Sequence, residues 1–331
     1  MPEEPYFWYN YCMKNQKTGV VVVGTGLIAR FHAQAVKASA KLELVAAVDL
    51  VRERAEKFAA EFGCAAYEDV DAALSRPDAG MVSVATPSGA HDDAVLAAAR
   101  HHVPVLVEKP LAITAERCDA MIAECERTGT PLGGIFQTRF SDDFLRAKRA
   151  VESGELGRIT FAKVEVPWWR DDSYYAGTWH GTREMDGGGA LINQAIHMVD
   201  WLVALMPPVV DVKAFTATLA HPMETEDTAA AVLRFEGGAL GSVYATTASY
   251  PGRGKRLEIT GTKGTYVWDD QTTGVSRPDQ LEYAGHLACF EAFADSVLGG
   301  APYPIDGREA RKSVDLIRRI YESAANVAHT P

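Results

Sequence analysis

The chain has 331 residues, of which 47 % are hydrophobic and 23 % charged, a composition typical of globular proteins and not of disordered ones. At about 150 residues per domain, this length predicts two domains. The formal net charge of −11 argues against an extended nucleic-acid surface or binding to an anionic membrane. No apolar run is long enough to span a bilayer.

The cysteines and the N-terminus indicate a cytoplasmic protein. The five cysteines include no C-x-x-C pair, which indicates reduced thiols and predicts neither a disulfide framework nor a metal site. The first residues are acidic where a signal peptide is basic. The aromatic segment Tyr6–Tyr11 is either an ordered arm or an extension upstream of a start at Met13. We treat residues 1–17 as an N-terminal extension and expect those before about Lys14 to be dispensable for catalysis.

From Thr18 to about Phe140, short apolar runs alternate with amphipathic stretches. Near-continuous apolar strands separated by helices predict a parallel sheet covered on both faces, and thus an α/β domain over residues 18–140. The predicted strands are Val20–Val23, Leu42–Val48, Met81–Ala85, Val105–Val107 and Leu132–Phe136, and the predicted helices begin at Leu27 or span Arg52–Phe62, His91–Arg100 and Ala115–Arg127.

Beyond Gly157 the pattern changes to closely spaced strands with glycine turns. Such spacing predicts an α+β domain with a large, mainly antiparallel sheet over residues 141–331. The predicted strands are Ile159–Val166, Val209–Thr218, Thr228–Phe235, Ala239–Thr247, Leu257–Thr260 and Gly264–Trp268, and the predicted helices are Ala190–Leu205, His286–Leu298 and Gly307–Ala325.

A dinucleotide-binding motif follows the first strand. The run Gly24-Thr25-Gly26-Leu27-Ile28-Ala29 matches G-x-G-x-x-G/A, and Asp49 ends the next strand twenty residues later, where a ribose-binding acid belongs. The alternative is an ordinary strand–turn–helix. Asp49 favours NAD, whereas Arg52 keeps NADP as the alternative because it could pair with a 2′-phosphate. The predicted cofactor contacts of this region are Gly24, Gly26, Leu27, Ile28, Asp49 and Arg52.

Polar residues also follow two later strands. In an open parallel sheet the carboxyl ends of the strands form the ligand crevice, which makes the residues there candidate cofactor contacts. A salt bridge between sheet and loop remains the alternative for Lys109. The candidates are Thr86, Pro87, His91, Glu108 and Lys109.

Candidate substrate contacts lie in the second half. Three glycines precede a helix on which Asn193 and His197 are four residues apart and share one face. With an unperturbed pKa of ~6.5, histidine is suited to proton transfer, although a lone helical histidine is more often a core or surface residue. In an aromatic segment, Arg170 could bind a carboxylate or phosphate beside Tyr175, and an interface or core role is the alternative. Arg139, near the domain junction, is a secondary candidate.

Together these motifs resemble those of the Gfo/Idh/MocA family, the glucose–fructose oxidoreductase and inositol dehydrogenase group. The resemblance extends from about Gly19 to Ala325 and rests on the glycine turn, the loop Thr86–His91, Glu108-Lys109-Pro110 and the block Gly187–Asp200, with Glu258–Gly264 also similar. It implies an NAD(P)-binding Rossmann domain joined to an α/β domain whose sheet forms the substrate pocket and often an oligomer interface. It also implies metal-free oxidation or reduction of a carbinol on a sugar, inositol or nucleotide sugar.

The resemblance further implies roles for individual residues. Lys109 would lie between nicotinamide and substrate and polarise the reacting oxygen, and His197 would be the general acid/base. One departure is Asn193, where the inositol dehydrogenase branch has Asp, and an amide cannot relay a proton as a carboxylate can. Asn at this place is similar to members that act on aminosugar nucleotides.

The sequence thus predicts a cytoplasmic, NAD-dependent oxidoreductase that acts on a sugar-like substrate. We expect a homo-oligomer, a dimer or tetramer, formed through the C-terminal sheet. Two rival functions remain: an NAD-dependent glycosidase that acts by transient oxidation, and a non-catalytic NAD(P)-binding regulatory protein.

Overall fold

The computed structural model describes residues 17–270 and 283–327, which form two compact units. The predicted boundary at residue 140 differs from this division, because the chain passes between the units several times. The aromatic segment Tyr6–Tyr11 lies outside the described residues. Of the described residues, the first unit contains 17–108, Asp119–Gln137 and 283–308, and the second contains Lys109–Cys118, 138–270 and 309–327.

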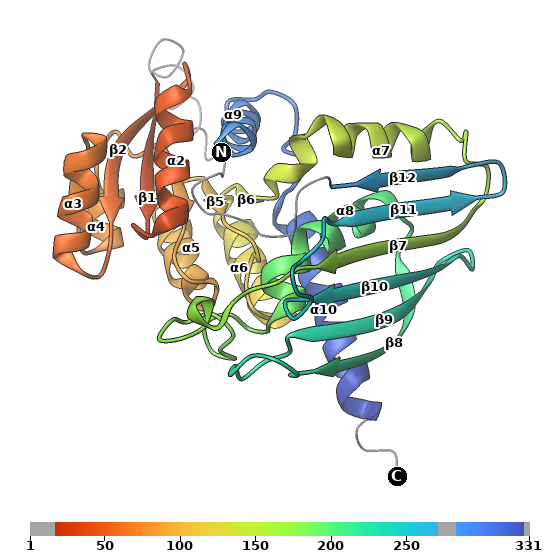
Figure 1. The fold of residues 1–331 in the computed structure, drawn as a ribbon. Helices are drawn as coiled ribbons and strands as arrows, with labels where there is room; N and C mark the ends of the chain where they lie inside the picture. The colour runs from red at the N-terminus through yellow and green to blue at the C-terminus, as the bar shows by residue number, and fades with distance from the viewer. Residues whose placement is uncertain (1–16, 271–282, 328–331) are drawn as a thin grey trace. The chain divides into compact units, whose positions relative to one another are not determined.

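The first unit is built on a six-stranded parallel sheet of order β3-β2-β1-β4-β5-β6 (Figure 1). Its central strands are apolar and fully buried, as a sheet covered on both faces requires. The strands are β1 (Thr18–Val23), β2 (Leu42–Val48), β3 (Ala65–Tyr67), β4 (Met81–Val84), β5 (Val105–Val107) and β6 (Leu132–Gly134), and the helices are α2 (Leu27–Ala38), α3 (Arg52–Phe62), α4 (Val70–Leu74), α5 (His91–Arg100), α6 (Ala115–Thr128) and α9 (Ala284–Val297).

The second unit contains a six-stranded sheet of order β12-β11-β7-β10-β9-β8, whose strands lie side by side in Figure 1. The sheet is mostly antiparallel, and β7 and β10 are its parallel pair. These two sheets confirm the predicted fold class. The strands are β7 (Ile159–Pro167), β8 (Val209–Ala217), β9 (Thr228–Phe235), β10 (Leu240–Thr246), β11 (Arg256–Gly261) and β12 (Thr265–Asp269), and the helices are α7 (Asp142–Glu152), α8 (Ile196–Leu205) and α10 (Gly307–Val327).

The predicted helix over residues 190–205 begins with a π-helical turn, Ala190–Ala195, before α8. The buried carboxylate of Glu226 accepts the backbone N–H groups of Gly189 and Leu191 at 3.0 and 2.9 Å, and its carbonyl accepts that of Ala190. A Cβ on Gly189 would lie 1.9 Å from that carbonyl oxygen, so only glycine allows this approach. The three-glycine block therefore lets a distant residue hold the start of the helix.

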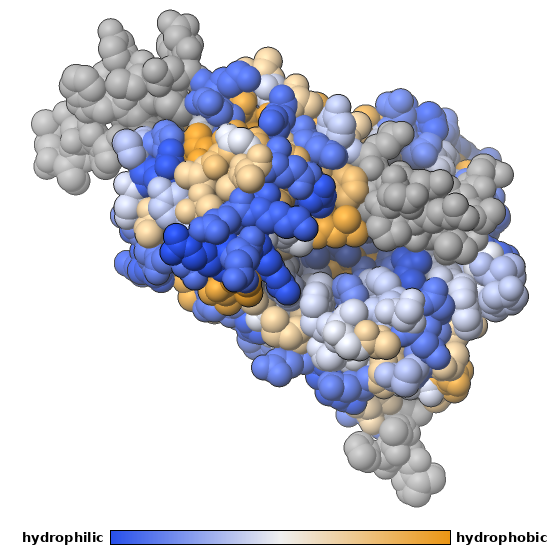
Figure 2. Space-filling view, turned by 60° about the vertical axis from the view of Figure 1, so that its left-hand side comes forward, coloured by the Kyte–Doolittle hydropathy of each residue, from blue (hydrophilic) through white to orange (hydrophobic). Residues whose placement is uncertain are grey.

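The outer face of the second sheet exposes large apolar side chains. Phe215, Val232 and Leu240 are 68, 59 and 50 % exposed, and the strand register places all three on this one face. In the view of Figure 2, apolar patches are interspersed with hydrophilic side chains. Among the described residues, no helix combines the length and apolarity needed to cross a membrane.

Candidate active site

The glycine turn after β1 is pressed against the end of the neighbouring strand β4. Gly24 has a φ of +90°, and a Cβ on it would lie 2.7 Å from the carbonyl of Ala85. A Cβ on Gly26, at the start of α2, would meet nothing within 4 Å, and no described side chain caps the helix. The first N–H groups of α2 can therefore bind an anion such as a pyrophosphate. Sheet order also puts this turn at the point where the strand order reverses, the usual dinucleotide site.

Asp49 lies beside this turn. Its Oδ2 accepts hydrogen bonds from the hydroxyl and backbone N–H of Thr25 at 2.6 and 3.2 Å, and its Oδ1 accepts the N–H of Val51 at 3.0 Å. The exposed guanidinium of Arg52 points to two acids instead, with 2.8 Å to Glu56 and 3.8 Å to Glu68. The structure thus brings the turn and the carboxylate together, and these residues fit NAD.

The loop after β4 lies next to the glycine turn and is closed by its own hydrogen bonds. The Thr86 hydroxyl donates to the carbonyl of Ala90 at 3.1 Å, and His91 Nε2 donates to the carbonyl of Thr86 at 3.0 Å. Thr86 and Pro87 are half-buried, whereas His91 is buried. Thr86 and Pro87 can still contact a cofactor, whereas the hydrogen bond of His91 is made to the loop.

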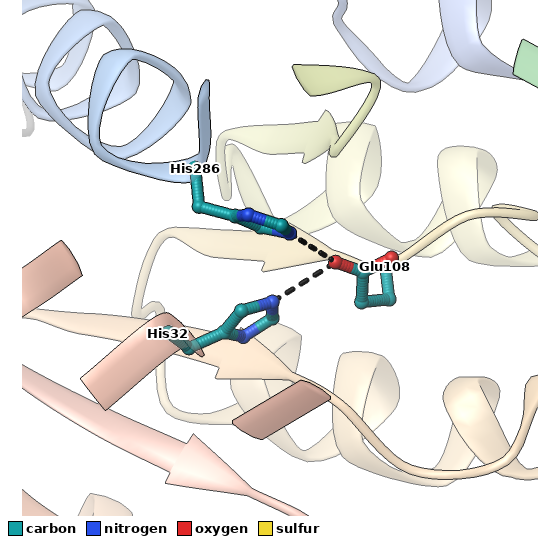
Figure 3. A group of neighbouring side chains, drawn as sticks. All are labelled: His32, Glu108 and His286. Carbon is teal, nitrogen blue, oxygen red and sulfur yellow. Dashed lines mark hydrogen bonds and ion pairs between the residues drawn. The ribbon is translucent and has the colours of Figure 1, made fainter. Parts of the chain in front are cut away.

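Glu108, at the end of β5, is bonded to two buried histidines (Figure 3). His32 Nε2 from α2 and His286 Nε2 from α9 lie 2.9 and 3.3 Å from the same Glu108 oxygen. Burial alone would raise the pKa of Glu108, but the hydrogen bonds from His286 and His32 hold it well below its ordinary value. Burial lowers the pKa of His32.

These three side chains also have the composition of a metal-binding set. Their ligand atoms lie within 4.8 Å of one another, and a His₂Glu set suits zinc. In the structure both histidines are bonded directly to Glu108, and His32 Nδ1 is 2.8 Å from the Ser83 hydroxyl. The predicted cofactor contact of Glu108 stays a prediction, because its side chain is 5 % exposed and bonded within the unit.

Lys109 begins the second unit and is held there by Asn193. Its Nζ donates to the backbone carbonyl of Asn193 at 3.0 Å. The side-chain amide of Asn193 donates to both carboxylate oxygens of Asp186, at 2.7 and 2.8 Å. A cation, an amide and a carboxylate thus form one cluster. Because Lys109 directly follows Glu108, the chain links this cluster to the end of β5.

Arg170 joins the same hydrogen-bonded cluster through Gln194. Arg170 Nη2 donates to Gln194 Oε1 at 2.7 Å, and Gln194 Nε2 donates to Asn193 Oδ1 at 2.7 Å. The guanidinium lies 4.9 Å from the ring centre of Trp168 and 5.2 Å from that of Tyr174. Among the described residues the buried Nε of Arg170 has no hydrogen-bond partner, and burial lowers the pKa of this guanidinium. This cation is therefore available to an anionic ligand.

His180 and Asp186 complete the cluster. The His180 ring stacks on Tyr174 at 4.4 Å, and its Nδ1 lies 3.9 Å from Asp186 Oδ2. Burial and the nearby cations Lys109 and Arg170 lower the pKa of His180 to about 4. Burial raises the pKa of Asp186 to about 6. Near neutral pH the site therefore holds a neutral histidine beside a carboxylate that is close to its titration range.

Four residues of this cluster, Tyr174, His180, Asp186 and Gln194, had no role predicted from the sequence. Three of them are direct neighbours of a predicted feature: Tyr174 precedes Tyr175, Gln194 follows Asn193, and Asp186 precedes the three glycines. Their chemistry was visible in the sequence, but only the fold shows that they meet.

The remaining predicted site residues differ in their surroundings. His197 lies half-buried in the first turn of α8, four residues beyond Asn193, and its acid/base role stays a prediction. The buried Tyr175 donates its hydroxyl to Thr247 at 2.9 Å. Arg139 is buried and forms ion pairs with Asp200 at 2.7 Å and Glu309 at 2.9 Å. Substrate contacts by Tyr175 and Arg139 also stay predictions, and the partners of both side chains lie within the unit.

Comparisons with known proteins identify both halves of the chain. A family model described as "Oxidoreductase family, NAD-binding Rossmann fold" matches residues 18–134, and the "GFO/IDH/MocA C-terminal domain" model matches residues 144–267. Myo-inositol 2-dehydrogenase of Thermotoga maritima is 28 % identical over 320 residues, which cover 89 % of this chain and 92 % of that protein.

Two solved structures are also similar. One is the WlbA dehydrogenase from Bordetella pertussis in complex with NADH and UDP-GlcNAcA. It is 33 % identical with a TM-score of 0.87, over 94 % of this chain and 98 % of that one. The other is the WlbA dehydrogenase from Chromobacterium violaceum, with the same ligands. It is 31 % identical with a TM-score of 0.87, over 95 % of both chains.

Proposed function

Because the chain belongs to the Gfo/Idh/MocA family of oxidoreductases and is an NAD-dependent dehydrogenase of CH–OH groups, we propose that it oxidises a carbinol of a nucleotide sugar carrying a negatively charged group. The observation that carries the proposal is Arg170, a largely buried cation in the cluster of Lys109 and Asn193. The similarity to WlbA dehydrogenases, solved with the nucleotide sugar UDP-GlcNAcA, supports the same class.

The environment of Arg170 suits an anion. A buried guanidinium with an unsatisfied N–H group is costly, and a carboxylate or phosphate would offset that cost with two parallel hydrogen bonds to the guanidinium fork. The Trp168 and Tyr174 rings hold the guanidinium plane in place. Arg170 is thus pre-organised to recognise an anionic substituent of the sugar.

The reaction assigns one task to each remaining group. When bound, NAD accepts the hydride from the substrate carbon. Lys109 stabilises the developing alkoxide with its positive charge, and His197 accepts the hydroxyl proton. Asn193 orients Lys109 through its carbonyl.

The test is an absorbance assay of NAD reduction with three substrates: UDP-N-acetylglucosamine, its uronic acid and myo-inositol. We expect turnover of the uronic acid, and a KM for it that rises at least about tenfold in Arg170→Leu, the loss of one charged hydrogen bond or more. The control is Arg146→Leu, an arginine on α7 whose side chain is 56 % exposed. Equal turnover of the uronic acid and of UDP-N-acetylglucosamine by both wild type and Arg170→Leu would overturn the proposal. Sugar release without net NADH would instead identify a glycosidase.

We also propose that the protein self-associates through the outer face of the second sheet and works in the cytoplasm. The exposed Phe215, Val232 and Leu240 on this face support the first point, since such patches mark interaction sites. Four described cysteines are free thiols, three of them buried, which supports a reducing compartment.

A further inference from the structure

Asp186 is a buried carboxylate in the cluster around Lys109. It is 1 % exposed, and its Oδ2 accepts the backbone N–H of Gly181 at 2.8 Å in addition to both bonds from the Asn193 amide. The one described ion-pair partner of Asp186 is His180, at 3.9 Å. A carboxylate buried with so little compensation is costly, which is common where the charge has a functional role.

The hydrogen bonds fix which way the Asn193 amide points. Its oxygen accepts from the Tyr174 hydroxyl at 3.2 Å and from Gln194 at 2.7 Å, and its nitrogen donates to Asp186. The backbone carbonyl of this same residue accepts the Lys109 ammonium. Asp186 therefore reaches Lys109 through a single residue, Asn193, whose amide is hydrogen-bonded at both its oxygen and its nitrogen.

We propose that Asp186 is a positioning residue of the dehydrogenase, whose negative charge holds Asn193 and, through it, the ammonium of Lys109 at the reacting centre. The proposal rests on the proposed function of Lys109. Residue 193 is an amide and carries no charge, and Asp186 supplies the carboxylate that this part of the site would otherwise lack.

Protonation of Asp186 would weaken this arrangement, because a carboxylic acid presents a hydroxyl where the ion presents a second acceptor oxygen. The charged and titratable groups that face Asp186 are Lys109, His180, Tyr174 and Tyr175. Burial raises the pKa of Asp186 to about 6, so its ionisation falls just below neutral pH. The rate is thus expected to fall as the pH drops through this range.

The experiment compares wild type, Asp186→Asn and the exchanged pair Asp186→Asn/Asn193→Asp. We expect Asp186→Asn to lower kcat at least about tenfold with an unchanged NAD dissociation constant, and to remove one acid limb of the pH–rate profile. The exchanged pair returns a carboxylate–amide couple to the site and should recover part of kcat. A purely structural role would lower the melting temperature of Asp186→Asn and leave the pH profile unchanged.

A second readout does not depend on the substrate. Reductive methylation of Lys109, followed by mass spectrometry, should be roughly tenfold faster in Asp186→Asn, because loss of a facing anion favours the reactive neutral amine. Lys213, whose side chain is 74 % exposed on the outer sheet face, is the internal control and should not change.

The kinetic and the methylation measurements distinguish a failure of the Asp186 proposal from a failure of the proposed function. Unchanged Lys109 reactivity in Asp186→Asn would overturn the proposal for Asp186. If that variant does not fold, methylation of Lys109 that is roughly tenfold faster in the exchanged pair than in wild type would overturn it, because the pair keeps a carboxylate at the site. Faster methylation of Lys109 in Asp186→Asn, together with no NAD reduction on any of the three substrates, would overturn the proposed function alone.

Discussion

A single residue, Asp49, bears on the choice between NAD and NADP through the position of its carboxylate. It lies against the glycine turn, where it can accept both hydroxyls of the adenosine ribose and would repel a 2′-phosphate. Arg52, which could have offset that repulsion, pairs with Glu56 and Glu68. We therefore expect tighter binding of NADH than of NADPH, and a narrower gap in Asp49→Ala. Fluorescence titration of both cofactors measures this, and tighter NADPH binding by wild type would contradict it.

The assignment of the proton carrier is tested at His197. A positioned acid–base group contributes about 10²–10⁴-fold, so His197→Ala should lower kcat by that factor with NAD affinity nearly unchanged. Lys109→Met should cost at least as much, because it removes the charge at the reacting oxygen. Steady-state kinetics with separate NAD dissociation constants provide the measurement. Near-full turnover in His197→Ala would exclude the assignment.

If His197 is not the group that accepts the hydroxyl proton, Tyr175 is a poor alternative. Burial raises its pKa to about 12, and its hydroxyl donates to Thr247, so it does not release a proton near neutral pH. In that outcome Lys109 is the group to examine.

At the scale of secondary-structure elements, Glu108 ties α2 and α9 to the end of β5 (Figure 3). Glu108→Gln removes the charge that both histidines face and should lower the free energy of unfolding by about 1.5–3 kcal/mol. Because the folded pKa of Glu108 is held low, its ionisation stabilises the fold above the ordinary pKa of glutamate, and this contribution is lost as the pH falls through the folded pKa.

The variant should therefore show a shallower loss of stability in acid than wild type, measured by denaturant unfolding between pH 7 and pH 3. His32 acts in the same direction below about pH 6.5, because burial lowers its pKa and the unfolded chain then binds more protons. Parallel pH curves for wild type and Glu108→Gln would contradict this account. A zinc-dependent rise in melting temperature, lost in His286→Ala, would show that the three side chains hold a metal.

Several elements could be predicted from the sequence nearly to the residue, among them α3 and β9, because both are long and strongly periodic. Strand β3 and helix α4 were not predicted, because three and five residues are too few for a period to show. Helix α7 was not predicted either, although Ser141 caps it by accepting the N–H of Phe144. The π-helical turn had no local signal, since Glu226 lies 35 residues from Leu191.

At the scale of the whole molecule, the division into two units depends on contacts between distant parts of the chain. Helix α9 was expected in the C-terminal domain, but His286 and Phe290 of this helix pack on His32, at 5.3 Å between ring centres in both pairs. Such long-range packing leaves no trace in local periodicity. The same limit explains why the candidate site was predicted residue by residue, while the cluster of Arg170, Asp186 and Asn193 required the fold.

The expected self-association can be tested by a substitution on the outer face of the second sheet. Val232 is 59 % exposed between Lys213 on β8 and Ser242 on β10, so an aspartate there would put a charge in the middle of an apolar contact. A stable interface buries about 800 Å² per partner, and one central charge without a partner costs enough to disrupt it.

We expect wild type to be a dimer or tetramer by light scattering, and Val232→Asp to have a lower mass at the same concentration. Leu50→Asp, at a side chain that is 91 % exposed in the first unit, is the matched control and should keep the wild-type mass. Because the proposed site lies within one chain, the dissociated variant should retain NAD binding. A monomeric wild type, or an equal loss of mass in Leu50→Asp, would place the interface elsewhere or show that there is none.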